Sequence, residues 1–288
     1  MTLSSIRFLA AFALTLVSAT ATFAQAPSTS SPQVLNLAEP DFTLIGLPTS
    51  LRLPTFKSAF RVTHRFTRPI DCDTCSNSFV ADGFGTDGGA VIGLEYRFGI
   101  VPNGEIGVHR TADKTVELFG QYGLLRQGAD APVEASALAA VDVNNVGRSG
   151  ADSNYSPALG VIVSRLIGDQ AAVYVEPIWV HHTNLFEQKT VANNDTFLVG
   201  LGARVRVLPT VYLLGEFSPR VSGYEPGVNQ GSFGVEKRLG GHMFQLNVSN
   251  SFGTTLGQIA RGAAKEVRSN GTTKQNWYFG FNITRKFF

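Results

Sequence analysis

Apolar and polar residues alternate with a period of two along most of the chain after residue 55. In a strand, successive side chains point to opposite faces, so this period predicts strands with one apolar face and one polar face. One of the clearest cases is 276–287, where apolar residues occupy every second position from Trp277 to Phe287 except Arg285. The best candidate for a short helix is 256–267. The predicted strands are 56–67, 88–98, 104–111, 115–124, 132–143, 157–166, 171–181, 195–207, 210–218, 231–239, 242–251 and 276–287.

The connections between these twelve stretches alternate in length. Those after even-numbered strands are short, such as 208–209 and 240–241, and most of those after odd-numbered strands are long and polar, such as 68–87 and 252–275. Outer-membrane barrels show this asymmetry, with short periplasmic turns and long extracellular loops. Strands of about ten residues also match the length that crosses a bilayer. The pattern predicts an all-β fold, an antiparallel transmembrane β-barrel of about 12 strands in the cell outer membrane.

The first 26 residues have the features of a secretory signal peptide. Arg7 precedes an apolar run at 8–17 that is too short to span a bilayer, and small residues follow it. Residues 27–55 are rich in proline, serine and threonine, which predicts an extended periplasmic N-terminal segment. Whether this segment enters the barrel is left open. The remaining residues, 56–288, form the predicted barrel.

Composition narrows the class of protein further. Charged residues make up 16% of the 288 residues, against about 25% in a usual soluble protein. The formal net charge is only +2, so the chain lacks the basic excess with which proteins bind nucleic acid. The expected surroundings are therefore the lipid bilayer of the outer membrane, with no nucleic acid partner.

The C-terminal stretch resembles the assembly strand of outer-membrane barrels. Such strands usually end in phenylalanine, with apolar residues at every second position before it, and the resemblance implies contact with the barrel-assembly machinery. Here the apolar register leads to the penultimate residue, Phe287, rather than to Phe288. The residues assigned to the assembly strand are Trp277, Phe279, Phe281, Ile283, Phe287 and Phe288.

Three further stretches, 60–66, 175–179 and 255–260, resemble an uncharacterised family of porin-like bacterial β-barrel proteins. The likeness spans most of 45–288. It implies a barrel in the cell envelope and carries no activity with it.

Charged residues gather on the less apolar face of the strands. A charge that faces lipid costs about 2–4 kcal/mol at the midplane, so this face should line the lumen. We expect the arginines on one arc of the ring to face a wall that carries Glu105, Glu117 and Glu134. The expected lumen residues are Lys57, Arg61, Arg65, Arg97, Arg204, Arg206, Arg238, Glu95, Glu105, Glu117, Glu134, Glu176, Glu216 and Glu236.

Two functions fit such a lumen. An open lumen would be a passive porin-like channel that selects small polar solutes by charge. A lumen filled by ion pairs would make a plugged barrel with a structural or surface-interaction role, because long arginine side chains can close a narrow barrel. The sequence does not decide between them.

Other candidate chemistry is sparse. Cys72 and Cys75 lie in the first long loop, and an oxidising envelope favours a disulfide bond between them. A hydrolase would need a histidine beside a serine, as His64 with Ser58, or His109. The chain has no Gly-x-Ser-x-Gly signature, so it is not expected to be an enzyme. No catalytic residue, metal ligand or cofactor is predicted.

Overall fold

The computed structural model describes residues 36–72, 75–148, 154–184, 194–223, 227–263, 266–267 and 273–288. These residues belong to one compact unit. The predicted signal peptide, 1–26, and residues 27–35 lie outside the described residues.

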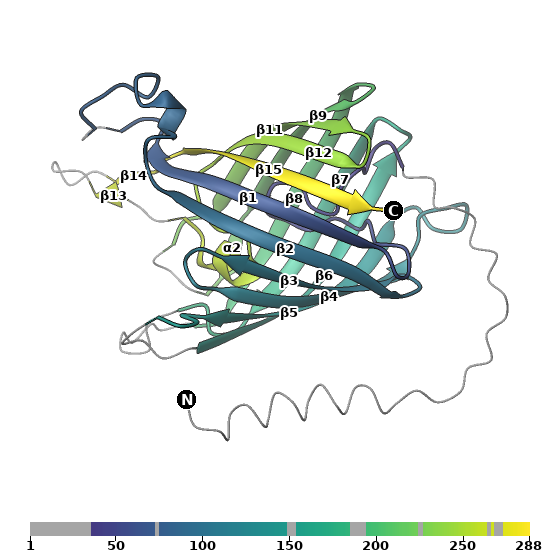
Figure 1. The fold of residues 1–288 in the computed structure, drawn as a ribbon. Helices are drawn as coiled ribbons and strands as arrows, with labels where there is room; N and C mark the ends of the chain where they lie inside the picture. The colour runs from purple at the N-terminus through teal and green to yellow at the C-terminus, as the bar shows by residue number, and fades with distance from the viewer. Residues whose placement is uncertain are drawn as a thin grey trace. The chain divides into compact units, whose positions relative to one another are not determined.

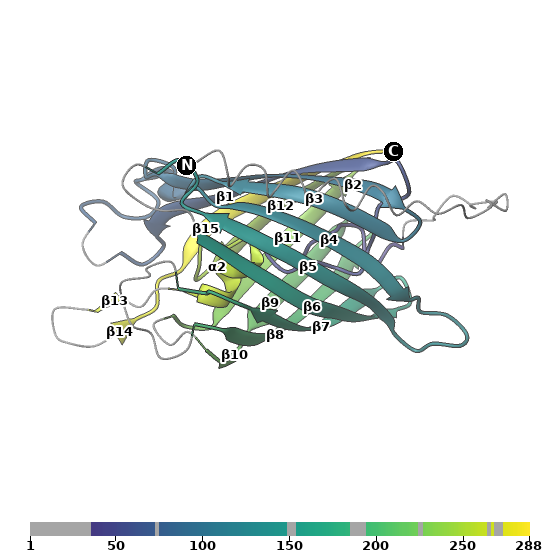
Figure 2. The same cartoon turned by 90° about the horizontal axis from the view of Figure 1, so that it is seen from below.

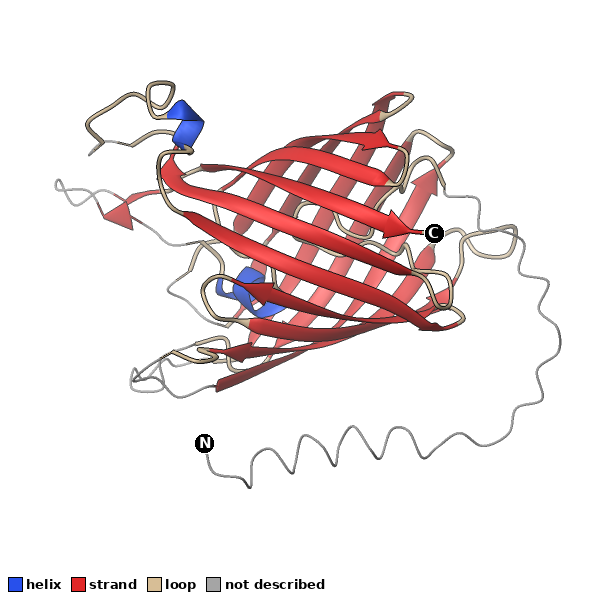
Figure 3. Ribbon diagram, in the orientation of Figure 1, coloured by secondary structure: helices blue, strands red, loops and turns tan. Residues whose placement is uncertain are grey.

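Twelve long strands form one closed antiparallel barrel (Figure 1; Figure 3). Each strand pairs with its neighbour in the ring, and the ring closes where β1 pairs with β15 and where β8 pairs with β9. The predicted fold class is therefore confirmed. The strands are β1 (Ser58–Pro69), β2 (Ala90–Val101), β3 (Gly104–Thr111), β4 (Val116–Leu125), β5 (Glu134–Asn144), β6 (Asn154–Ile167), β7 (Ala171–Val180), β8 (Thr196–Leu208), β9 (Val211–Ser218), β11 (Gln230–Leu239), β12 (His242–Ser249) and β15 (Tyr278–Phe287).

The remaining elements are short and belong to the connections. The strand β10 (Arg220–Ser222) pairs with β8 just beyond β9. The short strands β13 (Glu266–Val267) and β14 (Thr273–Lys274) pair with each other in the connection that joins β12 to β15. A single 3-10 turn, η1 (Gly83–Gly85), lies between β1 and β2.

Loop length separates the two ends of the barrel. The turns at 102–103, 209–210 and 240–241 have two residues each, whereas 70–89 and 250–277 are long. Figures 1 and 2 show η1 and the pair β13–β14 at the end opposite to the C-terminus. Because the barrel has an even number of strands, β1 starts and β15 ends at the short-turn end. This is the predicted arrangement, in which the short-turn end is periplasmic.

The outer face of the barrel is apolar and the inner face is polar. Leu94, Ile106 and Leu213 are each 48% exposed on the outside, whereas Thr63 and Asn282 are buried within. On β15 the apolar residues predicted to face lipid lie on the outer row, and Asn282 and Thr284 lie on the inner row. An apolar belt around a closed sheet is what a bilayer requires, because closure leaves no strand edge without hydrogen bonds. Among the helices of the described residues, none is long and apolar enough to cross a membrane.

Residues 36–55 fold inside the barrel as a chain segment that we call the insert. Every residue from 38 to 50 is buried. The insert bends repeatedly, and at its centre Leu44 N–H donates to the Leu47 carbonyl at 2.8 Å. The prediction of an extended periplasmic segment is therefore wrong for residues 36–55. The reason is that the wall supplies both an apolar surface for the leucines of the insert and polar partners for its main chain.

The helix α2 (Leu256–Arg261) lies in the interior and comes from the long-loop end (Figure 1). Thr255 and Gln258 form a capping box at its start, which satisfies main-chain N–H groups there. The helix starts at the residue predicted and ends earlier than 267, because Gly262 adopts φ 72° and turns the chain away. Its residues Leu256 to Ala260 are buried, and it packs against β5, β6, β7 and β8.

Candidate functional site

One carboxylate of the barrel wall holds the centre of the insert. Glu216 lies on the inner row of β9 and accepts hydrogen bonds from three consecutive main-chain N–H groups. The distances are 3.0 Å from Ile45, 2.9 Å from Gly46 and 3.1 Å from Leu47. Three N–H donors directed at one carboxylate satisfy its hydrogen-bond acceptors, so the main chain of the insert stabilises Glu216 inside the barrel.

The carbonyl groups of the same turn meet donors from other strands. The Ile45 carbonyl accepts from Arg61 Nη2 at 2.5 Å and from Asn282 Nδ2 at 3.1 Å, with Arg65 Nη2 at 3.4 Å. The Leu44 carbonyl accepts from Gln245 Nε2 at 2.9 Å. Arginines of β1 and amides of β12 and β15 therefore converge on two neighbouring peptide groups.

Further contacts hold the two ends of the insert. Arg204 Nη2 donates to the Thr43 carbonyl at 2.7 Å, and Gln121 Nε2 donates to the Thr49 carbonyl at 2.9 Å. Arg52 of the insert pairs with Glu134 at 2.5 Å. These contacts involve strands on different sides of the ring, so the insert crosses the lumen and fills it.

The apolar side chains of the insert fit against two glycines of β8. Leu44 lies against Gly202 so closely that a side chain at 202 would collide with it, and a Cβ at Gly200 would lie 3.0 Å from Leu47 Cδ1. Both leucines belong to one apolar cluster inside the barrel. The barrel strands and α2 also contribute to this cluster, through Ile162, Ile178, Leu198, Leu214, Met243 and Ile259.

The helix α2 meets two acidic side chains of the wall. Leu256 N–H donates to Glu117 Oε1 at 2.8 Å, and Thr255 Oγ1 donates to Asp142 Oδ2 at 2.6 Å. Between the helix and the insert lies a cavity of about 30 Å³, lined in part by Arg61, Glu117 and Leu256. A cavity of that size can take water but is too small for an organic solute.

The structure places most of the predicted lumen residues in the interior. Arg206 and Arg238 are only half-buried. Lys57 is exposed, because it precedes the first residue of β1 and lies in the turn before the strand. The buried members of the predicted set are Arg61, Arg65, Arg97, Arg204, Glu95, Glu105, Glu117, Glu134, Glu176, Glu216 and Glu236.

These charges pair with near neighbours instead of facing each other across the lumen. Arg97 bridges Glu95 at 2.5 Å and Glu105 at 2.7 Å, on its own strand and on the next. Arg61 also reaches Glu95, at 3.2 Å. The expected separation into a basic arc and an acidic wall is therefore wrong, because acids lie within the basic arc and adjacent strands bring opposite charges together.

Several interior residues were missed because only charged residues were collected from the inner row. Gln121 and Gln245 occupy the same row and bind the insert through their amide groups. Asn282 was expected to face inward, but its bond to the insert was not foreseen. Gly200 and Gly202 carry no polar group at all and act by leaving space. One available signal was the apolar run 44–47 within an otherwise proline- and serine-rich segment.

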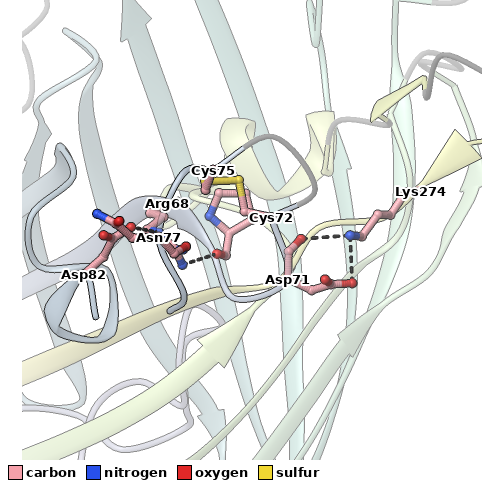
Figure 4. The surroundings of a disulfide bond; sticks show 8 residues. Arg68, Asp71, Cys72, Cys75, Asn77, Asp82 and Lys274 are labelled. Carbon is pink, nitrogen blue, oxygen red and sulfur yellow. Dashed lines mark hydrogen bonds and ion pairs between the residues drawn. A yellow bond between two sulfur atoms is a disulfide. The ribbon is translucent and has the colours of Figure 1, made fainter. Parts of the chain in front are cut away.

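The first long loop contains the expected disulfide bond, between Cys72 and Cys75 (Figure 4). Arg68 pairs with Asp82 at 2.5 Å behind the disulfide, and Lys274 near β15 pairs with Asp71 at 2.7 Å. These contacts tie the loop to the chain before β15. Within the part of the chain that the structure describes, no group of three or more acidic, histidine or cysteine side chains could hold a metal ion.

The histidines considered for a hydrolase lie in unsuitable positions. Ser58 and His64 are six residues apart on β1, about 20 Å at the usual rise of a strand, so they cannot share a proton. His64 lies on the outer row and stacks on Phe281 with ring centroids 4.7 Å apart. His109 is buried inside the barrel, 3.9 Å from a carboxylate oxygen of Glu95 and of Glu117.

The closed sheet, the apolar outer belt and the polar interior define a membrane-spanning β-barrel, a structure of the outer membrane. The chain belongs to the family described as membrane bound beta barrel domain (DUF5777), whose model matches residues 43–287. The predicted family resemblance and outer-membrane location are thereby confirmed. None of the curated proteins matches the chain.

Solved structures with a similar fold include outer-membrane channels. An outer membrane channel from Pseudomonas putida F1 has a TM-score of 0.51 at 9% identity, covering 83% of this chain and 98% of that one. The NanC porin has a TM-score of 0.50 at 6% identity, covering 81% of this chain and 100% of that one. Outer membrane phospholipase A from Escherichia coli gives 0.45 at 14% identity, covering 87% and 95%. At these identities the likeness concerns the fold alone.

Proposed function

We propose that this protein is an outer-membrane channel for small polar solutes, and that the insert and α2 hold it closed in the conformation described. Support for the proposal comes from how the lumen is filled. Among the described residues, the ion pairs within the barrel wall join positions on the same strand, on adjacent strands or two strands apart. Two chain segments fill the space that the wall encloses, one from each end of the barrel.

The proposal rests on the way in which the insert is attached to the barrel. The described contacts that hold residues 36–55 to the wall are hydrogen bonds, ion pairs and apolar packing, and the insert continues directly into β1 at one end. Displacement of the insert would leave the twelve wall strands paired as they are. It would expose an inner wall of arginines, glutamates and amides, which is the lining that suits a path for polar solutes.

A plugged barrel without transport is the second candidate, and the burial of every residue from 38 to 50 favours it. An insert with that many contacts could be a permanent part of the interior. The two candidates differ in whether weakening the insert opens a conducting path.

A substitution in the insert separates them. Leu47→Asp places a carboxylate beside Gly200, whose partner on the neighbouring strand is Glu176. The new carboxylate is buried and lies next to a second acid, so the substitution should weaken the binding of the insert. We expect the variant to conduct ions in planar bilayers far more often than the unchanged protein. Leu47→Asn is the matched control, because it loses the same apolar contacts without adding charge and should conduct less often than Leu47→Asp. A folded Leu47→Asp protein that stays silent would support the plugged barrel.

A further inference from the structure

We propose that the opened lumen takes short peptides with apolar side chains, and that the insert occupies the site of these solutes in the closed state. This inference rests on the proposed channel function and names its solute class. It starts from the way in which the wall binds the insert.

The wall recognises the main chain of the insert more than its side chains. Around residues 44–47, Glu216 binds three N–H groups, while Arg61, Asn282 and Gln245 bind the carbonyls of Ile45 and Leu44. N–H and carbonyl groups are common to every peptide. A site built from such contacts therefore accepts peptides as a class, whereas a sugar offers hydroxyl groups in a different arrangement.

The same contacts suit the two charged ends of a free peptide. The three N–H groups directed at Glu216 stand in the place of an ammonium group, which has three donors and a positive charge. The Ile45 carbonyl, which meets the guanidinium groups of Arg61 and Arg65, stands in the place of a carboxylate. The donors and the carbonyl belong to one tight turn at 44–47, so a short zwitterionic peptide must bend as the insert does to present both charged ends here.

A second acid near Glu216 fits this assignment. Glu176, on β7, is fully buried, and neither of its carboxylate oxygens has a hydrogen-bond partner among the described residues. Burying a carboxylate without hydrogen-bond donors costs free energy. A ligand group that donates hydrogen bonds to it therefore binds there more strongly than at a carboxylate that already has donors. Glu176 pairs with Gly200 and Glu216 pairs with Gly202, two residues apart on β8, so the two acids flank the same stretch of that strand. An ammonium group between these two acids would satisfy both.

The expected preference for peptides with apolar side chains comes from the space beside the glycines of β8. Leu44 and Leu47 occupy the space left by Gly202 and Gly200 and pack on the apolar wall of β6, β7 and β8. When the insert leaves, this space becomes available to side chains of similar size. The vacated site thus combines acidic, basic and apolar parts, each of which a peptide with leucine-like residues can contact.

Swelling of proteoliposomes tests the inference, with the Leu47→Asp protein as the opened channel. The probes are the tripeptide leucyl-glycyl-leucine, its N-acetylated and C-amidated form, and sucrose. We expect the free tripeptide to enter faster than both other probes. Glu216→Gln in the same background should lower the ratio of tripeptide entry to sucrose entry by about tenfold, the effect of losing one charged hydrogen-bond partner. The ratio is compared because Glu216 also holds the insert, so its loss can raise entry of every solute. Asp169→Asn, which removes one acid from the exposed turn between β6 and β7, should change neither rate.

The outcomes distinguish this inference from the channel function. Ion conductance with equal entry of tripeptide and sucrose, or a ratio of the two rates that Glu216→Gln leaves unchanged, would overturn the peptide inference and keep the channel. Absence of ion conductance in both Leu47→Asp and a second opening variant, Gly46→Phe, would overturn both. The second variant is suitable because a Cβ at Gly46 already lies 3.2 Å from Glu216 and 3.4 Å from Ile259.

Discussion

At the scale of single residues, several buried charged groups of the interior are held by protein hydrogen bonds and ion pairs. Glu216 has main-chain donors, Arg97 has two acids, and Glu39 of the insert accepts from Tyr174 Oη at 2.8 Å and from Ser50 Oγ at 3.0 Å. Burial is the largest influence on Glu39, and it raises the pKa of this carboxyl from 4.5 to about 7. Glu39 is therefore the residue of the insert most sensitive to pH near neutrality.

The shifted pKa of Glu39 predicts that the insert binds less firmly as pH rises. The pKa of Glu39 is about 7 while the insert is inside the barrel and 4.5 when the carboxyl is free in water. The protonated carboxyl therefore favours the inserted state fully below pH 4.5, and this stabilisation is lost as pH rises through about 7. We expect the apparent melting temperature in detergent to fall between about pH 5 and pH 8, by an amount that corresponds to about 1–3 kcal/mol. Glu39→Gln keeps an acceptor for Tyr174 and should flatten this dependence. An equally steep fall in the Glu39→Gln protein would show that another group causes it.

At the scale of elements, the two fillers of the lumen are held in different ways. The insert is bound through its main chain by strands all around the ring, whereas α2 is positioned by its capping residues and by its apolar face on β5 to β8. Thr255 has a double role, since its hydroxyl accepts from Gln258 N–H and donates to Asp142. The N-terminus of α2 thus depends on one side chain.

Removal of that hydroxyl should loosen α2. Thr255→Ala loses the cap and the bond to Asp142, which costs about 1–2 kcal/mol for a helix cap. We expect faster hydrogen exchange at the main-chain N–H groups of Ile259 and Gly262, which bond to the Thr255 and Gln258 carbonyls. Thr254→Ala is a suitable comparison, because Thr254 contacts Gln258 through its main-chain N–H, which the substitution keeps. Equal exchange rates in the two variants would mean that the cap does not hold the helix.

At the scale of the whole molecule, the barrel could be read from the sequence and its filling could not. Period-two alternation places Trp277, Phe279 and Ile283 outside and Asn282 inside, because lipid and interior impose opposite requirements on neighbouring residues. The insert has no such period. It is bound through N–H and carbonyl groups, which every residue possesses, so residues 44–47 differ little in sequence from a short apolar run in a linker. The same limit applies to Gly200 and Gly202, whose role depends on what fills the space beside them.

The central claim is that residues 36–55 close the lumen and can leave it. Cysteines at Leu44 and Gly202 test it directly, since Leu44 lies against Gly202 and its Cγ would be 3.7 Å from a Cβ there. The measurement is single-channel conductance of the Leu44→Cys, Gly202→Cys protein before and after reduction, with Leu44→Cys alone as the control for reduction of the Cys72–Cys75 bond. We predict a silent channel while the two cysteines are joined and openings once they are reduced. Equal conductance in the joined and reduced states would contradict the account.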